Sequence, residues 1–510
     1  MHRPLKFGST VVESSWGNKN AFGLSLYLTL MDLRSYYKFL APWSTFVDFL
    51  STLETTSYNT PQCKPGLCYR EVSFGFDDAK QKASGHLQYQ RHWSVKALTR
   101  EQQTAELAEK TARAAPLRID IGAEYNVEPA LRWMGVDTEG YQRELCFDID
   151  VTDYSDVRAC GCGSEQHGNR MICRRCWGFI GAAAAALDYL LRATFGYQHL
   201  VWVFSGRRGI HCWVLDARTL SLSTAARRQI VDHFRSLRAG NLLLSSNAPA
   251  CAVYTNILLP RFEALLAAGT LEFAQEKALL RLGQCLLPIA GSPLSKLLLS
   301  TTAETGPSRW DRCKKLLGTA HPEMLMRIVF SFVFPRLDEA VTASPEHLLR
   351  APFSVHQETG NVCVVLQAAG HPIDNFDPTE DAPNIRLGRH IDNDRFDPWK
   401  RNFIEATLPR LSWASQLFCR LCYSNRRSQH RRVPVVTAAA ELCIQPFFFG
   451  TDRDSWLDHW REEHPDTAAP SQDASTLAWL IAEESLDAKR FCEDFNLRSQ
   501  LFSIFQRQLK

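Results

Sequence analysis

Residues Glu144–Val151 form the most constraining stretch of this sequence, because apolar and acidic side chains alternate along it. In an extended strand, successive side chains point to opposite faces, so Asp148 and Asp150 share one face while Phe147 and Ile149 lie on the other. The two carboxylates would lie roughly 6–7 Å apart between Cα atoms, close enough to share divalent cations and to repel each other without them. An Asp-X-Asp pair alone is more often two exposed positions on a half-buried strand, so the other motifs decide between these interpretations.

A glycine-bracketed loop lies between the apolar runs 200–204 and 212–215. This order predicts a β-hairpin. Gly206 and Gly209 allow the backbone to approach a ligand closely, and the two arginines between them are planar donors suited to phosphate oxygens. A serine and a histidine complete the candidate phosphate site, which consists of Ser205, Arg207, Arg208 and His211. The alternative interpretation is a basic, solvated turn.

Four of the sixteen cysteines are closely grouped. Met1–Asn20 lacks the apolar core of a signal peptide, so we expect an intracellular chain whose cysteines are reduced thiols or metal ligands rather than disulfides. Four thiolates in two close pairs are typical of a closed structural zinc site; these are Cys160, Cys162, Cys173 and Cys176. Chance clustering in a cysteine-rich chain is the alternative.

Two weaker groups also contain potential metal ligands. His167 lies between the two cysteine pairs and could replace one thiolate, although an exposed loop histidine is the simpler interpretation. Cys419 and Cys422 lie near His430, but two neighbouring thiols on one helix explain this pair more simply than a second metal site does.

The succession of sequence patterns predicts an α/β (α+β) fold. Helical spacing covers residues 24–53, a mixed α/β pattern covers 70–214, a mostly helical pattern covers 215–329, and β-type residues return at 330–366. A helical insert that interrupts one α/β sheet would explain this order. We therefore divide the chain into a polar extension (1–23), a first core part (24–214) with the zinc motif at 160–176, a helical insert (215–329), a second core part (330–390) and a largely helical C-terminal extension (391–510).

Composition excludes little. With 45% hydrophobic and 22% charged residues, we expect ordinary globular cores. The net charge of +3 does not by itself predict nucleic-acid binding, because a chain that binds cations needs carboxylates that offset its basic patches. No run approaches the roughly 18 uninterrupted apolar residues of a membrane helix, so we expect no membrane association.

Taken together, these motifs resemble the small catalytic subunit of archaeal and eukaryotic primases, and the eukaryotic form most of all. The runs Phe147–Arg158 and Ser205–Trp213 carry the resemblance, and the cysteine group lies between them, where this family holds zinc. Further along, Phe334–Asp338 resembles the element with the third metal-binding carboxylate, and His347–His356 resembles a nucleotide-binding segment. The similarity extends from about residue 33 to residue 385.

The resemblance implies a primase-type mixed-sheet core that synthesises short RNA primers on single-stranded DNA by two-metal nucleotidyl transfer. Asp148, Asp150 and Asp338 would hold Mg²⁺ or Mn²⁺, and the four grouped cysteines would hold structural Zn²⁺. Arg350 stands where the family usually has lysine, and arginine and lysine are not equivalent donors. The residues implied in binding the triphosphate are Ser205, Arg207, Arg208, His211, Arg350 and His356.

The same resemblance implies partners and a location. We expect a single-stranded DNA template, ribonucleoside triphosphates, a primase large subunit with an iron–sulfur cluster, the DNA polymerase alpha complex, and a nuclear location. Two alternatives stay open: a primase–polymerase of the same superfamily in repair or damage bypass, and a non-catalytic nucleic-acid-binding subunit. The second would lack one of the acidic residues, whereas all three are present.

Overall fold

The computed structural model describes residues 33–50, 66–77, 87–97, 99–134, 142–162, 172–239, 247–274, 276–300, 304–366 and 372–407. The predicted extension at 1–23 and most of the one at 391–510 lie outside the described residues, as do His167, Cys419, Cys422 and His430. Among the helices that are described, none is long and apolar enough to cross a membrane.

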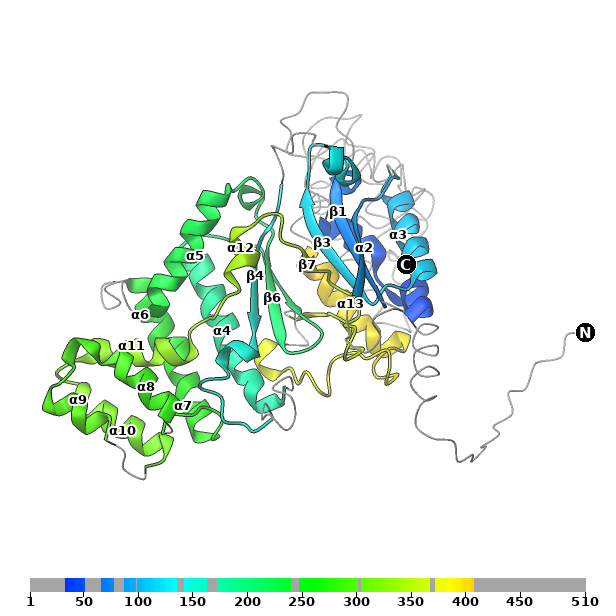
Figure 1. The fold of residues 1–510 in the computed structure, drawn as a ribbon. Helices are drawn as coiled ribbons and strands as arrows, with labels where there is room; N and C mark the ends of the chain where they lie inside the picture. The colour runs from blue at the N-terminus through cyan, green and yellow to red at the C-terminus, as the bar shows by residue number, and fades with distance from the viewer. Residues whose placement is uncertain are drawn as a thin grey trace, which may run out of the picture.

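One antiparallel sheet has the strand order β2-β1-β3-β7. Its strands are β1 (Arg70–Asp77), β2 (Leu87–Trp93), β3 (Arg118–Glu124) and the short β7 (Leu349–Arg350). The helices α2 (Trp43–Leu50) and α3 (Arg100–Ala114) pack against each other beside this sheet (Figure 1). Thr99 begins α3 as its N-cap, because its side chain accepts a hydrogen bond from the backbone N–H of Gln102.

A second antiparallel sheet has the order β4-β6-β5-β8. Its strands are β4 (Leu145–Asp150), β5 (Leu200–Phe204), β6 (Gly209–Val214) and β8 (Val365–Leu366). Every residue of β5 and β6 is buried, because α4 (Arg174–Ala193) packs on β4 and β6 while α13 (Asn393–Thr407) packs on β5 and β8. The hairpin and the β-type runs on either side of α4 are therefore as the sequence predicts.

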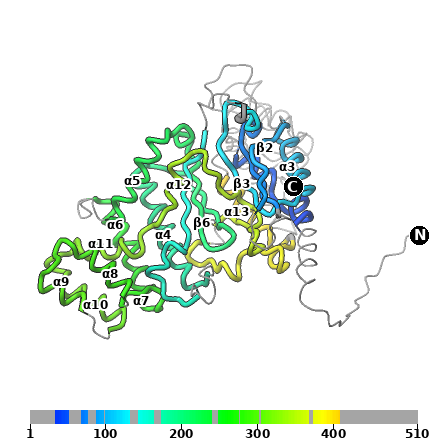
Figure 2. The backbone as a smooth tube through the Cα atoms, in the orientation of Figure 1, coloured from blue at the N-terminus to red at the C-terminus, as the bar shows by residue number. Residues whose placement is uncertain are grey.

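Helices dominate the stretch after β6, and they form a lobe beside the second sheet (Figure 1). Figure 2 follows the chain from α11 past α5 into α12, which contacts both α5 and β4. The helices are α5 (Thr224–Ala239), α6 (Ala248–Val253), α7 (Leu259–Ala267), α8 (Glu276–Cys285), α9 (Pro293–Leu298), α10 (Gly306–Leu317), α11 (Pro322–Val333) and α12 (Glu339–Ala343). Shorter helical turns are η1 (Tyr36–Leu40), η2 (Gly66–Cys68), η3 (Pro129–Met134), η4 (Val151–Tyr154), η6 (Ala217–Thr219), η8 (Tyr254–Leu258), η9 (Leu287–Ile289) and η10 (Ile373–Asn375).

Two expectations about the strands are wrong. Residues 330–366 were expected to be β-type, but they contain the end of α11, all of α12 and only two two-residue strands. Those strands join different sheets, so the core has two four-stranded sheets in place of one. A short apolar run such as Phe330–Val333 is equally compatible with a buried helix and a buried strand, and its periodicity cannot separate them.

A buried ion pair joins the two sheets where the second one begins. Arg70, the first residue of β1, donates from Nη1 and Nη2 to the two carboxylate oxygens of Glu144 at 2.9 and 3.0 Å, and both side chains are fully buried. Arg70 also donates to the carbonyl of Gly122 in β3. Next to it, Arg143 donates to the same carbonyl and lies over the Trp213 ring in β6. The start of β4 is thus fixed against both sheets.

We predict that Glu144→Ala lowers the free energy of unfolding by roughly 3–5 kcal/mol, because it removes the hydrogen-bonded carboxylate of the buried Arg70 guanidinium and leaves only the more distant Glu124, 3.8 Å away. Chemical denaturation measures this change. Glu128→Ala is the matched control, because Glu128 pairs with Lys96 on the surface and such pairs contribute at most about 1 kcal/mol. Equal effects of the two substitutions would contradict the assignment.

Candidate active site and metal centre

The first two predicted metal-binding carboxylates lie on β4, the outer strand of its sheet. Asp148 is opposite His211 and Asp150 is opposite Gly209 in the ladder with β6. Both aspartates are partly exposed, whereas the alternate residues Phe147 and Ile149 are fully buried. The strand therefore presents its two carboxylates on one face, as its alternation requires.

Asp338 lies beside these two carboxylates although it is far from them in the sequence. Its backbone N–H donates to the carbonyl of Asp148 at 3.0 Å, and Thr342 Oγ1 donates to the carbonyl of Cys146 at 2.8 Å. The Asp338 side chain is the N-cap of α12 and accepts from the backbone N–H of Ala340. The segment around α12 thus lies along the outer side of β4 and brings the third carboxylate to the first two.

A pocket of about 510 Å³ contains all three carboxylates. The pKa of Asp148 is raised to about 7, first by burial and then by the charges of Asp150 and Asp338, and the pKa of Asp153 is raised by burial and by Asp150. Divalent cations would relieve this repulsion. The residues lining the pocket are Asp148, Asp150, Asp153, Arg238, Arg336, Leu337, Asp338 and Glu339.

Asp150 is already engaged by protein groups. Arg208 Nε lies 3.0 and 2.8 Å from its two oxygens, and Oδ1 also accepts from the backbone N–H and the hydroxyl of Thr152. The contact joins the basic loop directly to the carboxylate strand. A cation on Asp150 would have to compete with Arg208 for these oxygens.

The glycines of the loop permit two close backbone approaches. Gly206 has φ +88°, and a Cβ atom there would lie 2.7 Å from the Cβ of His356. A Cβ on Gly209 would lie 2.6 Å from the carbonyl oxygen of Ile149. Ser205 closes the turn, because its hydroxyl accepts from the N–H of Gly209 at 3.0 Å. Asn361 Nδ2 donates to the Gly206 carbonyl at 3.1 Å, which holds the loop against the segment that contains His356.

Among the remaining predicted nucleotide-binding residues, the two arginines supply positive charge beside the two histidines. Arg207 pairs with Glu358 at 2.5 Å. Arg350, from β7 of the other sheet, donates from Nη2 to Gln357 at 3.0 Å, while its Nη1 is buried without a hydrogen-bond partner among the described residues. The pKa of His211 is lowered to about 3 and that of His356 to about 2, first by burial and then by the charge of Arg350. The pattern suits a multiply charged anion.

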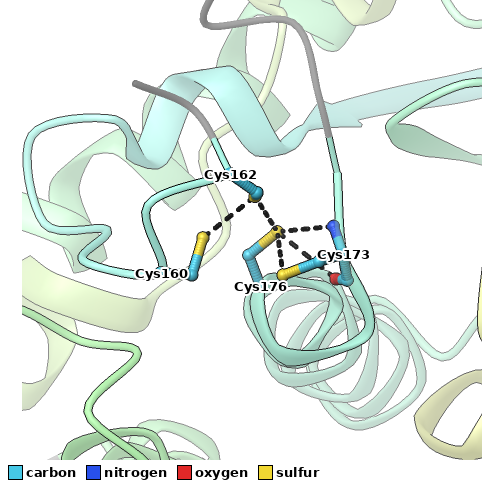
Figure 3. A group of neighbouring side chains, drawn as sticks. All are labelled: Cys160, Cys162, Cys173 and Cys176. Carbon is cyan, nitrogen blue, oxygen red and sulfur yellow. Dashed lines mark hydrogen bonds between the residues drawn. The ribbon is translucent and has the colours of Figure 1, made fainter. Parts of the chain in front are cut away.

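The four grouped cysteines converge although ten residues separate the two pairs. In Figure 3, Cys160 and Cys162 approach Cys173 and Cys176 at the start of α4. The Sγ–Sγ distances are 3.0 Å for Cys160–Cys162, 3.5 Å for Cys162–Cys176 and 3.7 Å for Cys173–Cys176. All four sulfur atoms lie within 4.8 Å of one another, so the group could bind a metal such as zinc.

Without a metal, these thiols cannot all ionise. Hydrogen bonds from Cys176 and Cys162 hold the pKa of Cys160 at about 4, whereas burial and the bond to Cys160 raise the pKa of Cys162 to about 12. Among the described residues, only this group brings three or more potential ligand atoms within 4.8 Å of one another. The carboxylates share a pocket but do not converge as tightly as the thiols.

Comparison with known proteins identifies the family. The sequence profile of the DNA primase small subunit matches residues 147–368. A DNA primase small subunit of Drosophila melanogaster is 31% identical over 327 residues, which cover 59% of this chain and 72% of the relative. This chain belongs to the DNA primase small-subunit family. The small subunit of Saccharomyces cerevisiae is 28% identical over 378 residues, covering 69% and 83% of the two chains.

The similarity also reaches archaeal members. The small subunit PriS of Thermococcus onnurineus is 26% identical over 272 residues, covering 50% of this chain and 69% of the relative. The segment that matches the family profile contains every predicted site residue from Asp148 to His356. The site described above therefore lies in the part of the chain that is similar to the primase small subunit.

Sequence reasoning assigned no role to five of the residues that line the acidic pocket, which are Asp153, Arg238, Arg336, Leu337 and Glu339. Asp153 and Arg336 lie within the two motifs that carry the family resemblance, and their charge was the available signal. Arg238 lies on α5, in the predicted helical insert, where no motif marks it. Only the packing of α5 on α11 and α12 brings it to the pocket.

We predict that Cys173→Ser lowers the content of bound metal in the purified chain to well below one equivalent, because a hydroxyl is a poor replacement for a thiolate ligand. The melting temperature should fall with it, since the site joins the segment after β4 to α4. Elemental analysis and thermal melting measure the two effects. Cys251→Ser, outside the group, is the control; one full equivalent of zinc in Cys173→Ser would show that these thiols are not the ligands.

Proposed function

We propose that this chain is the catalytic subunit of a primase and synthesises short RNA primers on single-stranded DNA by two-metal nucleotidyl transfer. One observation carries the proposal: a pocket of carboxylates and a loop of phosphate-type donors lie on two paired strands, β4 and β6. Asp150 and Arg208 meet where the two groups adjoin. An enzyme that joins nucleotides needs both groups next to each other, because cations and a triphosphate must share one site.

In this proposal, Mg²⁺ or Mn²⁺ held by Asp148, Asp150 and Asp338 would activate the attacking hydroxyl and stabilise the charge on the leaving pyrophosphate. The donor set fits such hard cations, since all three are carboxylates and share one pocket. The raised pKa of Asp148 fits as well, because it reflects first the burial of the carboxyl and then the negative charge of Asp150 and Asp338.

The loop and its surroundings would bind the triphosphate. Arg207 from the loop and Arg350 from β7 supply guanidinium donors, and Nη1 of Arg350, which is buried without a partner among the described residues, is available to a phosphate oxygen. The triphosphate and Asp150 would compete for Arg208. His211 and His356 are neutral in the free chain because burial and nearby arginines lower their pKa, and an added anion would oppose this effect. Ser205 would hold the turn in shape through its bond to Gly209.

We further propose the remaining features that the family implies. Zn²⁺ on the four cysteines would be structural, because four thiolates leave no open coordination position. The name small subunit, carried by the relatives, supports assembly with a primase large subunit, and through it with DNA polymerase alpha in the nucleus. In the proposed domain division, residues 24–214 and 330–390 build the catalytic core and residues 215–329 are an insert.

We predict that the chain incorporates labelled ribonucleotides on a single-stranded DNA template only when divalent metal is present. Asp148→Ala and Asp338→Ala should abolish this incorporation, because each removes a ligand from the acidic pocket. Asp232→Ala, which removes an exposed carboxylate on α5, should retain it. Near-normal synthesis by either pocket variant would exclude the proposed mechanism, and incorporation of deoxynucleotides alone would favour a repair polymerase.

We predict that Arg207→Ala and Arg350→Ala each weaken nucleotide binding by roughly 1.5–3 kcal/mol, the usual contribution of a hydrogen bond to a charged group. Titration of a ribonucleoside triphosphate against the folded variants measures this loss. Arg218→Ala is a suitable control, because Arg218 lies on the surface after β6 and contacts Tyr197. Unchanged affinity in both test variants would reduce the loop to a solvated basic turn.

A further inference from the structure

Two groups of cations flank the carboxylates. One group belongs to the basic loop and its surroundings, and it touches the carboxylates through Arg208 on Asp150, next to the neutral imidazole of His211 beside Asp148. The other group, Arg238 and Arg336, lines the acidic pocket. None of the six predicted nucleotide-binding residues lines that pocket. The pocket is therefore a second space, which shares the carboxylates with the triphosphate site but not its phosphate donors.

Most charged groups around this second space are already held by the protein. Arg336 is almost fully buried, pairs with Asp156, and donates to the carbonyls of Asp153 and Ser331. Glu339 accepts from Arg235, whose Nε lies 2.9 Å from Oε1. These contacts fix both side chains as parts of the wall.

Arg238 differs from its neighbours. It is half-buried in the last turn of α5, and it has no hydrogen bond or ion pair with any residue that the structure describes. The helix itself is firmly held, because Phe234 and Leu237 are buried and α5 packs on α11 and α12. Burial and the nearby charge of Arg336 lower the pKa of Arg238. A guanidinium on a well-packed helix, with no partner in the part of the chain that the structure describes, has its donors available to a ligand.

The chemistry of the proposed reaction indicates which ligand this is. In an in-line displacement, the attacking hydroxyl and the leaving pyrophosphate lie on opposite sides of the reacting phosphorus. The basic loop would bind the pyrophosphate side. The space on the other side of the carboxylates is then left for the nucleotide whose hydroxyl attacks.

We propose that Arg238 binds a phosphate of the nucleotide that supplies the attacking 3′-hydroxyl. In the first step this phosphate belongs to the initiating nucleotide, and in later steps it is the last phosphodiester of the growing primer. The inference rests on the proposed function, since it assigns one substrate phosphate of that reaction to Arg238. A purely structural role, in which Arg238 only offsets the charge of the acidic residues, is the competing explanation.

The test compares Arg238→Gln with the unaltered full chain in two assays on defined templates. The first extends a preformed RNA primer while the concentrations of primer–template and of incoming nucleotide are varied separately. We expect the KM for primer–template to rise at least about tenfold, as for a lost charged hydrogen bond, while the KM for the incoming nucleotide changes less than about twofold. Arg228→Gln, an exposed arginine on the same helix, is the control and should change neither value.

The second assay varies the initiator, which is supplied as a nucleoside, a monophosphate or a triphosphate. The unaltered chain should prefer the phosphorylated initiators, and Arg238→Gln should lose this preference while using the nucleoside as before. Arg238→Lys should recover part of it, because the charge is kept but the planar fork is lost. If thermal melting shows that Arg238→Gln is not folded, the lysine variant alone is used. An unaltered preference for phosphorylated initiators and an unaltered KM for primer–template in Arg238→Lys would overturn the proposal.

Other outcomes overturn it as well. Arg238→Gln could lose the same share of activity with nucleoside and with phosphorylated initiators, or recover full activity at high Mg²⁺ concentration with a shifted pH profile of activity. Either result would mean that Arg238 only balances the charge of the acidic residues. An unchanged KM for primer–template in Arg238→Gln would remove any role in binding. If the unaltered chain makes no primers at all, the proposed function fails first, and this result is distinguishable from every outcome for the variants.

Discussion

The ion pair between Arg70 and Glu144 sets the geometry on which the candidate site depends. The predicted metal ligands Asp148 and Asp150 lie on β4, whereas Arg350 comes from β7 of the other sheet. Without a fixed contact between the sheets, donors on one would not stay aligned with carboxylates on the other. Burying two charges is costly, and apolar side chains often stabilise a core equally well. The pair instead fixes the orientation of one sheet relative to the other, because Nη1 and Nη2 of Arg70 must each meet one carboxylate oxygen of Glu144.

The site combines a negatively charged region, the carboxylates, with a positively charged region, the arginines around the basic loop. Repulsion between like charges would destabilise each region alone. Burial and the repulsion between the carboxylates raise the pKa of Asp148, while burial and the nearby arginines lower the pKa of His211 and His356. The ion pair between Arg208 and Asp150 joins the two regions directly. A site arranged in this way sacrifices stability of the free chain, since its like charges are brought together before any cation or anion neutralises them.

Local patterns predicted the parts of the site that depend on local geometry. The alternation around Asp148 follows from the strand period, and the glycines of the loop predicted a hairpin that the structure contains. The position of Asp338 could be inferred from family resemblance alone, because the backbone bond to Asp148 links residues far apart in sequence. Arg238 could not be predicted, since it depends on how α5 packs. The strand assigned to Phe330–Val333 was wrong because a buried helix has the same apolar composition.

The bonds from Asp338 and Thr342 to the carbonyls of β4 have a consequence for folding. β4 lies at the edge of its sheet. Without the bonds from Asp338 and Thr342, its carbonyls at Asp148 and Cys146 would be free to pair with a strand from another molecule. The segment that brings the third carboxylate therefore also protects the chain from aggregation. Because Thr342 follows Cys146 by 196 residues, the edge of β4 can be covered only late in synthesis.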